Sequence, residues 1–271
     1  MTIKLILAGC GNMGYAMLAG WVKSTKLKAA EVLVVEPAEA LRSRAEALDC
    51  LAVADATGIP ADTKPELVVL AVKPQVIREA TAAYKKFGNG ETTFLSVAAG
   101  TPVATFAAIL GERTPIVRCM PNTPAAIGKG MMVMFSNSLV SETTKKDVAD
   151  LLSSSGAVAA IDDEVLMDAV TAVSGSGPAY IFHFIECLTA AGEHAGLPIQ
   201  TAKLLAMQTV YGAAALAAES GEEPGLLRQQ VTSPNGTTAA ALGVLMGGDR
   251  LKNLVAEAVE AARARSVELG K

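Results

Sequence analysis

Three glycines near the N-terminus, Gly9, Gly11 and Gly14, follow one another with the spacing G-x-G-x-x-G. A short apolar segment, residues 5–8, precedes them, and a helix-like segment, residues 15–22, follows. In a strand–turn–helix setting, the first glycine permits a tight turn, the second lets the backbone approach a pyrophosphate, and the third lets helix and strand pack closely. The helix N-terminus offers free N–H groups to an anion. The motif therefore predicts a dinucleotide site.

The same segment has a second interpretation. Leu7-Ala8-Gly9-Cys10 is similar to the cleavage box of a bacterial lipoprotein signal, in which Cys10 would be lipidated. Such a signal needs an apolar region of about 7–15 residues. Only five apolar or small residues separate Lys4 from Cys10. We therefore favour the nucleotide interpretation.

Two polar clusters in the second half of the chain are further candidates. Ser174–Pro178 precedes a helix-like segment with proline at its start, and Thr232–Thr238 precedes another. Serine, threonine and asparagine are common helix caps. So many polar or turn-forming residues in succession also suit a cradle for an anion at a helix N-terminus. From the residues alone, both interpretations stay open.

Acid–base and metal-binding candidates are few. The two histidines, His183 and His194, stand 11 residues apart and would share one stripe of a helix, where we expect packed or hydrogen-bonded side chains. Spacing indicates no third metal ligand, and the four cysteines form no C-x-x-C pair. We expect no metal, and reduced thiols in a cytoplasmic protein.

Composition narrows the class of protein. Of the 271 residues, 51% are hydrophobic and 4% aromatic, and the mean hydropathy is +0.37. No run reaches the roughly 20 apolar residues of a membrane span. A net charge of −4 and a pI near 5.4 argue against nucleic-acid binding. We expect no membrane or nucleic-acid partner.

The pattern of elements changes halfway along the chain. Strand-like segments recur up to residue 161 and indicate a doubly wound sheet: residues 3–7, 31–36, 67–72, 93–97, 116–118, 131–135 and 157–161. Helix-like segments follow: residues 163–173, 178–195, 198–220, 224–231, 237–246 and 251–269. We predict an α/β Rossmann-type domain over residues 1–162 and an all-α domain over residues 163–271.

Several of these helices have little polar surface. The segment Tyr180–Leu188 is apolar on nearly all sides. A domain of about 110 residues cannot bury so many helices on every side by itself. We therefore expect a homo-oligomer, in which these helices pack against a second subunit.

The chain resembles the pyrroline-5-carboxylate reductase family. The resemblance rests on six motifs that occur in order along the chain: Gly9–Gly14, Ala71–Pro74, Ala98–Gly100, Met120–Pro124, Ser174–Tyr180 and Ser233–Thr238. It implies a Rossmann domain followed by a helical domain that forms a homodimer, with dimers associating further into a ring. It also implies reduction of 1-pyrroline-5-carboxylate to L-proline by hydride from NADPH or NADH, the last step of proline biosynthesis.

The resemblance also implies site residues. The cofactor would be bound by Gly9, Cys10, Gly11, Asn12, Met13, Gly14, Glu36, Ala71, Val72, Lys73, Pro74, Ala98, Ala99, Gly100 and Asn122. The substrate would be bound by Ser233, Asn235, Gly236, Thr237 and Ser176. The Thr238 hydroxyl would lie near the ring nitrogen as the catalytic group. A protonated imine is already a good electrophile, so positioning can supply much of the rate, while the cofactor carries the hydride.

Two positions depart from the family pattern. Glu36 follows Gly14 by 22 residues, where an acidic residue usually binds the ribose diol of NAD. The residue favours NADH and the family favours NADPH, and both stay open. Asn235 stands where the family often has glycine, and asparagine tolerates positive φ better than other residues.

Two rival functions fit the sequence less well. A 3-hydroxyacid dehydrogenase would have a catalytic lysine on a second-domain helix, but Lys203 is the only lysine between Lys146 and Lys252, and no glycine motif accompanies it. A dinucleotide sensor without catalysis would not need the Ser233–Thr238 loop.

Overall fold

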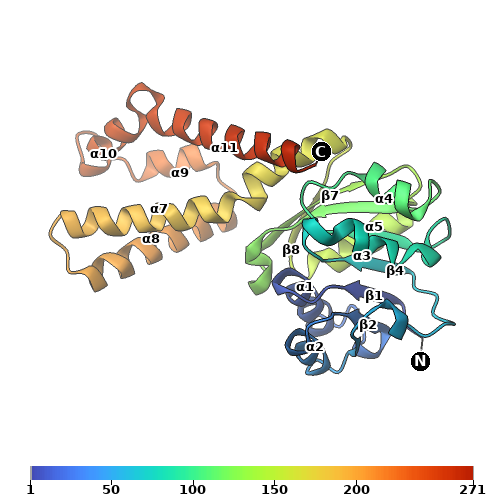
Figure 1. The fold of residues 1–271 in the computed structure, drawn as a ribbon. Coiled ribbons are helices and arrows are strands. Elements are labelled where there is room, and N and C mark those ends of the chain that lie inside the picture. Colours follow the sequence, from blue (N-terminus) through green and yellow to red (C-terminus); the bar gives the residue numbers. More distant parts are fainter. Residues whose placement is uncertain (1, 271) are drawn as a thin grey trace. The chain divides into compact units, whose positions relative to one another are not determined.

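The computed structural model describes residues 2–270, which divide into two compact units. The first unit comprises residues 2–176 and 262–270, and the second comprises residues 177–261. Most helices and several strands of the two units are labelled in Figure 1.

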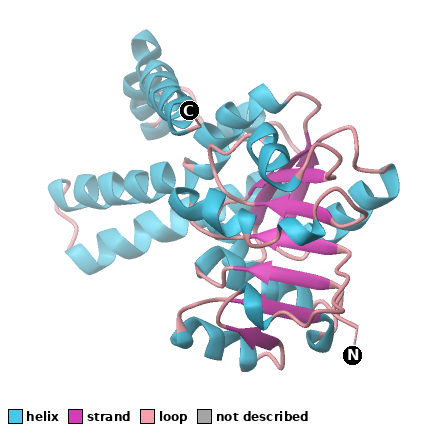
Figure 2. Cartoon of the chain, turned by 45° about the vertical axis from the view of Figure 1, so that its right-hand side comes forward, coloured by secondary structure: helices cyan, strands magenta, loops and turns pink. Residues whose placement is uncertain are grey.

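The first unit is built on one eight-stranded sheet, drawn in magenta in Figure 2. The strand order is β3-β2-β1-β4-β5-β6-β7-β8, and only β6 and β7 pair antiparallel. The order reverses beside β1, and doubly wound sheets bind ligands at such a switch point. The strands are β1 Leu5–Ala8, β2 Val32–Val35, β3 Leu51–Val53, β4 Leu67–Leu70, β5 Thr93–Ser96, β6 Ile116–Met120, β7 Gly130–Ser136 and β8 Gly156–Ala160.

Helices cover both faces of this sheet. One core contains Trp21 of α1 and Leu152 of α5, and the other contains Ile77 of α3 and Phe106 of α4. Strands buried on both faces are continuously apolar, as β1, β2 and β4 are here. The helices are α1 Asn12–Lys23, α2 Glu39–Glu46, α3 Ile77–Ala82, α4 Val103–Leu110, α5 Glu142–Ser153 and α6 Met167–Val170. Short 3₁₀ turns occupy Ala29–Glu31, Ala56–Gly58, Pro74–Val76, Lys85–Phe87, Thr123–Ile127 and Glu164–Leu166.

The second unit consists of helices with almost no interior. It contains α7 Gly177–His194, α8 Ile199–Ser220, α9 Pro224–Gln230, α10 Thr237–Met246, the 3₁₀ turn Gly247–Asp249 and the first part of α11 Arg250–Leu269. Within residues 177–261, only Ala202 and Ala206 are buried. They lie where α8 packs on α7, and a methyl group built on Gly192 would lie 3.1 Å from the Ala202 Cβ atom. A single copy therefore leaves most of the apolar surface of these helices uncovered.

The structure confirms the expected order, an α/β domain followed by helices. It also confirms the strands expected from the sequence. It adds β3, which the sequence did not indicate because only three residues form it. The expectation of one regular helix over residues 163–173 is wrong. The segment forms a 3₁₀ turn and α6, followed by a π-helix over Thr171–Gly175. The side chain of Asp163 accepts the Val165 N–H and fixes that first turn.

The compact units divide at a different place from the expected domains. Strands end with β8 at Ala160, next to the expected boundary, yet the first unit extends to residue 176. Side-chain contacts explain this extension. Glu164 is ion-paired with Arg118 of β6, and Ser266 of α11 is hydrogen-bonded to Asp168 of α6.

Among the described residues, no helix is long and apolar enough to cross a membrane.

Candidate active site

A cavity of about 630 Å³ opens at the carboxyl ends of β1, β2 and β4. Six of the predicted cofactor residues line it: Gly9, Gly11, Glu36, Ala71, Val72 and Lys73. Other lining residues, which sequence reasoning missed, include Leu41, Asp55, Val76, Glu79 and Tyr84. Asp55 follows β3, so recognising that strand would have indicated it. The cavity lies where the carboxyl edge of a doubly wound sheet binds nucleotides.

The glycine turn has the conformation that its sequence predicts. Gly9 has φ +93°, and a methyl group built on it would lie 2.7 Å from the Ala71 carbonyl oxygen, so a side chain is excluded there. A methyl group on Gly14 would collide with the Gly9 carbonyl. A methyl group on Gly11 would meet nothing within 4 Å, so this backbone faces open space. A ligand can therefore approach the turn closely at Gly11.

The α1 N-terminus lies directly behind this open position. The helix begins at Asn12, with Gly11 as its N-cap, and no side chain caps it. Its first N–H groups are therefore available to an anion, and the helix dipole favours negative charge there. The structure thus fits a pyrophosphate at the glycine turn.

Glu36 is bound to the same turn. The residue is 7% exposed, and its carboxylate accepts the Cys10 N–H at 2.8 Å and the Ala38 N–H at 2.9 Å. Burial, followed by the nearby Glu36 carboxylate, raises the pKa of the Cys10 thiol to about 11. The Cys10 side chain packs in the core, so only its backbone belongs to the turn.

The charges around the cavity are mostly negative. Its lining contains Glu36, Asp55 and Glu79 but one basic residue, Lys73. Hydrogen bonds from Thr57 hold the pKa of Asp55 below its usual value, so this carboxylate is ionised at neutral pH.

The two arginines that follow Glu36 are both engaged within the first unit. The Arg42 Nη1 atom donates to the carbonyl oxygens of Glu36 at 2.9 Å and Pro37 at 2.6 Å. The Arg44 guanidinium lies over the Tyr15 ring, 3.9 Å from its centroid.

Several predicted cofactor residues lie outside the cavity lining: Cys10, Asn12, Met13, Gly14, Pro74, Ala98, Ala99, Gly100 and Asn122. The segment Ala98–Gly100 follows β5, at the same edge of the sheet. The Asn122 side chain accepts the Met131 N–H at 2.8 Å and donates to the Ser174 carbonyl oxygen at 3.2 Å. Asn122 therefore links Ser174 to the start of β7.

In the second unit, the predicted substrate loop forms a turn that leads into α10. Asn235 has φ +59°, the conformation for which asparagine is the best substitute for glycine. The Gly236 N–H donates to the Ser233 carbonyl oxygen at 3.0 Å. Gly236 is the N-cap of α10, so no side chain caps this helix. The first N–H groups of α10 and the hydroxyls of Thr237 and Thr238 therefore belong to one helix start.

The histidines do not form a metal site in the described part of the chain, which contains no cluster of three candidate ligands. The His183 Nδ1 atom lies 2.9 Å from the Glu186 Oε2 atom. This is a surface contact on α7, because both side chains are about three-quarters exposed.

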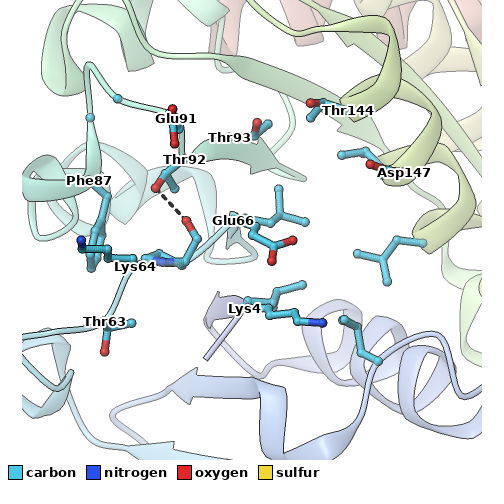
Figure 3. A pocket seen from close by; sticks show the side chains of 18 of the residues that line it. Lys4, Thr63, Lys64, Glu66, Phe87, Glu91, Thr92, Thr93, Thr144 and Asp147 are labelled. Carbon is cyan, nitrogen blue, oxygen red and sulfur yellow. Dashed lines mark hydrogen bonds between the residues drawn. The ribbon is translucent and has the colours of Figure 1, made fainter. Parts of the chain in front are cut away.

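A larger cavity, about 980 Å³, lies at the opposite edge of the sheet (Figure 3). It is lined by the residues at the amino ends of the strands, among them Lys4, Glu66 and Thr93. The Thr92 hydroxyl donates to the Pro65 carbonyl oxygen there at 2.7 Å. Since nucleotides bind at the carboxyl edge of such sheets, the smaller cavity is the candidate site.

The glycine turn, the helix N-terminus behind it and the cavity beside the switch point define a dinucleotide-binding protein of the Rossmann class. Comparison with known families agrees. Residues 2–100 match the family described as NADP oxidoreductase, coenzyme F420-dependent, and residues 164–269 match pyrroline-5-carboxylate reductase dimerisation.

Full-length relatives identify the family. The chain is 39% identical to pyrroline-5-carboxylate reductase of Pseudomonas aeruginosa over 270 residues, which cover 100% of this chain and 98% of that protein. It is 38% identical to the Synechocystis enzyme of the same name, over 100% of both chains. The chain belongs to the pyrroline-5-carboxylate reductase family.

Solved structures agree over the whole chain. A pyrroline-5-carboxylate reductase from Coxiella burnetii superposes with a TM-score of 0.92, at 33% identity and 100% coverage of both chains. Pyrroline carboxylate reductase of Plasmodium falciparum, solved with NADP bound, gives a TM-score of 0.85 at 30% identity, covering 99% of this chain and 98% of that chain. The 3-hydroxyacid dehydrogenase alternative is therefore set aside.

Proposed function

We propose that the chain reduces 1-pyrroline-5-carboxylate to L-proline with hydride from NADPH or NADH, the last step of proline biosynthesis. The observation that carries this function is full-length membership of the reductase family, in a chain whose glycine turn opens onto a cavity at the switch point. When bound, the reduced nicotinamide supplies the hydride.

The cofactor roles follow the order of the motifs. We assign the pyrophosphate to Gly9–Gly14, where Gly11 leaves room for it and α1 supplies N–H groups. We assign the adenosine ribose to Glu36 and the remaining ribose and nicotinamide to Ala71–Pro74, Ala98–Gly100 and Asn122. Of these segments, Ala71–Lys73 lines the cavity directly.

The substrate roles fall on the loop before α10. We assign the carboxylate to Ser233, Asn235, Gly236 and Thr237, together with Ser176. A helix N-terminus capped by a glycine offers N–H groups to a carboxylate without competition from a capping side chain. The positive φ of Asn235 keeps the turn in the shape that a glycine would allow.

The catalytic demand on side chains is small. The ring nitrogen of the protonated imine carries the positive charge, and it needs a hydrogen-bond acceptor rather than a strong acid. We assign this contact to the Thr238 hydroxyl, which would fix the orientation of the substrate ring. Positioning of the two reactants then supplies most of the rate.

The helical part of the chain, for which we propose the bounds 163–271, forms the subunit interface. The match to the dimerisation family covers residues 164–269, and most apolar side chains of α7, α8 and α10 are exposed in one copy. Burial of such surface drives association. We propose a homodimer, with dimers associating further into a ring.

We propose a cytoplasmic location. All four cysteines are unpaired, as is usual in a reducing compartment.

A spectrophotometric assay tests the function. Purified chain is mixed with 1-pyrroline-5-carboxylate and either NADPH or NADH, and loss of the reduced cofactor and formation of proline are measured. Turnover with a 1:1 yield supports the reductase. Binding of the cofactor without turnover supports the sensor alternative instead.

A further inference from the structure

The end of α11 packs against the segment that follows β5, although more than 160 residues separate them. A methyl group built on Gly100 would lie 3.4 Å from the Leu269 Cβ atom, which is ordinary contact distance. A methyl group built on Gly270 would lie 2.7 Å from the Gly100 carbonyl oxygen. Real side chains do not approach so closely, so Gly270 has room for no side chain while Gly100 stays in place.

Contacts from outside the segment lie against Gly100 and its C-terminal side. The φ of Gly100 is +72°, in the left-handed region, and it has no side chain to anchor it. The Val103 N–H, on the C-terminal side of this segment, donates to the Glu164 Oε1 atom at 2.8 Å, and the Arg118 Nη1 atom donates to the same oxygen at 2.6 Å. The backbone of Gly270 lies close to the Gly100 carbonyl, between that anchor and β5 in the sequence.

The end of α11 is itself fixed. Ser266 is 4% exposed, and its hydroxyl donates to the Asp168 Oδ1 atom at 2.6 Å. The Gly270 N–H donates to the carbonyl oxygens of Ser266 at 3.2 Å and Val267 at 3.3 Å. These bonds close the last turn of α11, one turn after Ser266. The contact with Gly100 therefore depends on a helix end with its own side-chain anchor in the first unit.

We infer that the end of α11 positions the Ala98–Gly100 segment for the nicotinamide half of the cofactor, so that Ser266 and Gly270 are positioning residues for hydride transfer. This inference rests on the proposed function, which assigns that segment to the nicotinamide. The pyrophosphate and adenosine residues, at the glycine turn and Glu36, have no contact with the end of α11 among the contacts described. Loosening α11 should therefore affect one half of the cofactor only.

The test uses the Gly270→Ala variant and measures the two halves of the cofactor separately. Gly90→Ala is the matched control, because Gly90 has no left-handed φ and a methyl group there would lie 3.9 Å from its nearest neighbours. Calorimetry measures the Kd of ADP-ribose and its 2′-phosphate, which lack the nicotinamide. Steady-state kinetics and the fluorescence of bound NADPH or NADH report on the nicotinamide.

We expect Gly270→Ala to leave the Kd of the nicotinamide-free ligand unchanged, to lower kcat roughly tenfold or more, and to reduce the fluorescence enhancement, since small misplacements of reacting groups cost up to about 10²-fold. Gly90→Ala should match wild type. The inference would be overturned if Gly270→Ala kept the kcat and the fluorescence of wild type. It would also be overturned if affinity for the nicotinamide-free ligand and kcat fell by the same factor, because that result indicates general damage.

Two further outcomes are distinguishable. If Gly270→Ala does not fold, Ser266→Ala decides: a selective fall in kcat supports the inference, and an unchanged kcat overturns it. If the wild-type chain shows no turnover, or if it binds neither of the two nicotinamide-free ligands, the proposed function fails and the inference fails with it.

Discussion

The Glu36 carboxylate accepts a hydrogen bond from the Cys10 N–H at 2.8 Å, which ties the end of β2 to the glycine turn after β1. The acidic residue is therefore fixed at the cavity wall rather than free to turn away. A fixed carboxylate can accept hydrogen bonds from a ribose diol, whereas it repels a 2′-phosphate. We propose that cofactor preference depends on this one buried carboxylate.

Glu36→Ser should shift the preference toward NADPH. We expect the ratio of kcat/KM for NADPH to that for NADH to rise about tenfold or more, because a like charge within about 4 Å costs more than 1.4 kcal/mol at a protein surface. Steady-state kinetics with both cofactors measure this ratio. Glu36→Gln separates charge from hydrogen bonding, and Glu39→Ser on the exposed start of α2 is the control. An unchanged ratio in Glu36→Ser would show that this carboxylate does not discriminate.

Thr238→Ala should lose turnover and keep cofactor binding. The loss of a hydrogen bond to a charged group costs about 1.5–3 kcal/mol, so we expect kcat to fall roughly 10- to 100-fold. Thr238→Ser retains the hydroxyl and should recover most of the activity. Cofactor Kd is measured by fluorescence titration alongside kcat. Near wild-type turnover in Thr238→Ala would remove this hydroxyl from the mechanism.

The local chemistry of the glycine turn was predictable from the sequence. Gly9 needs a positive φ and close approach, and both requirements are visible as residue type and spacing. The short strand Leu51–Val53 was not predictable, because three residues at the sheet edge, with Leu51 41% exposed, show no periodicity. Asp55, the second carboxylate of the cavity, was missed with it.

Contacts between residues far apart in the chain could not be predicted from the sequence either. Arg118 and Glu164 are 46 residues apart, and Ser266 and Asp168 are 98 apart. Nothing in the type or spacing of these residues indicates which partner each one finds. These contacts are why the first compact unit extends beyond the strand-rich part of the chain.

Breaking the Arg118–Glu164 ion pair should destabilise the first unit. The side chains are 9% and 26% exposed, so solvent screens Glu164 in part, and we expect Arg118→Met to lower the free energy of unfolding by about 1–3 kcal/mol. Lys145→Met breaks the exposed pair with Glu142 and should cost less than about 0.5 kcal/mol. Urea unfolding measures both variants. Equal stability of the two variants would contradict a structural role for the partly buried Arg118–Glu164 pair.

Three buried thiols should resist alkylation in the native protein. Burial raises the pKa of Cys10 and Cys50 to about 11 and that of Cys119 to about 12. The thiolate is the reactive form, so at pH 8 these residues stay protonated as well as inaccessible. Labelling with iodoacetamide, followed by mass spectrometry, should modify all three only after denaturation.

The same pKa shifts imply loss of stability at alkaline pH. An unfolded thiol releases its proton near pH 8.5–9, whereas the folded one keeps it to about pH 11. Between those values the unfolded chain binds fewer protons, so the free energy of unfolding falls as pH rises. Urea unfolding at pH 8 and pH 10 measures this change. Cys10→Ala with Cys50→Ala should reduce the difference between the two pH values, and an unchanged difference would exclude these thiols as its source.

A charge placed on the apolar surface of α7 should prevent dimer formation. Phe184 is 45% exposed in one copy of the chain, and we propose that a second copy covers it. Phe184→Lys would then bury an unpaired ammonium, which costs several kcal/mol and should produce monomers at micromolar concentration. Leu139→Lys, at a similarly exposed position of the first unit, should leave the assembly unchanged. Native mass spectrometry and light scattering measure the mass. A wild-type chain that is monomeric at all concentrations would contradict the proposed dimer, and a Phe184→Lys variant that dimerises like wild type would place the interface elsewhere.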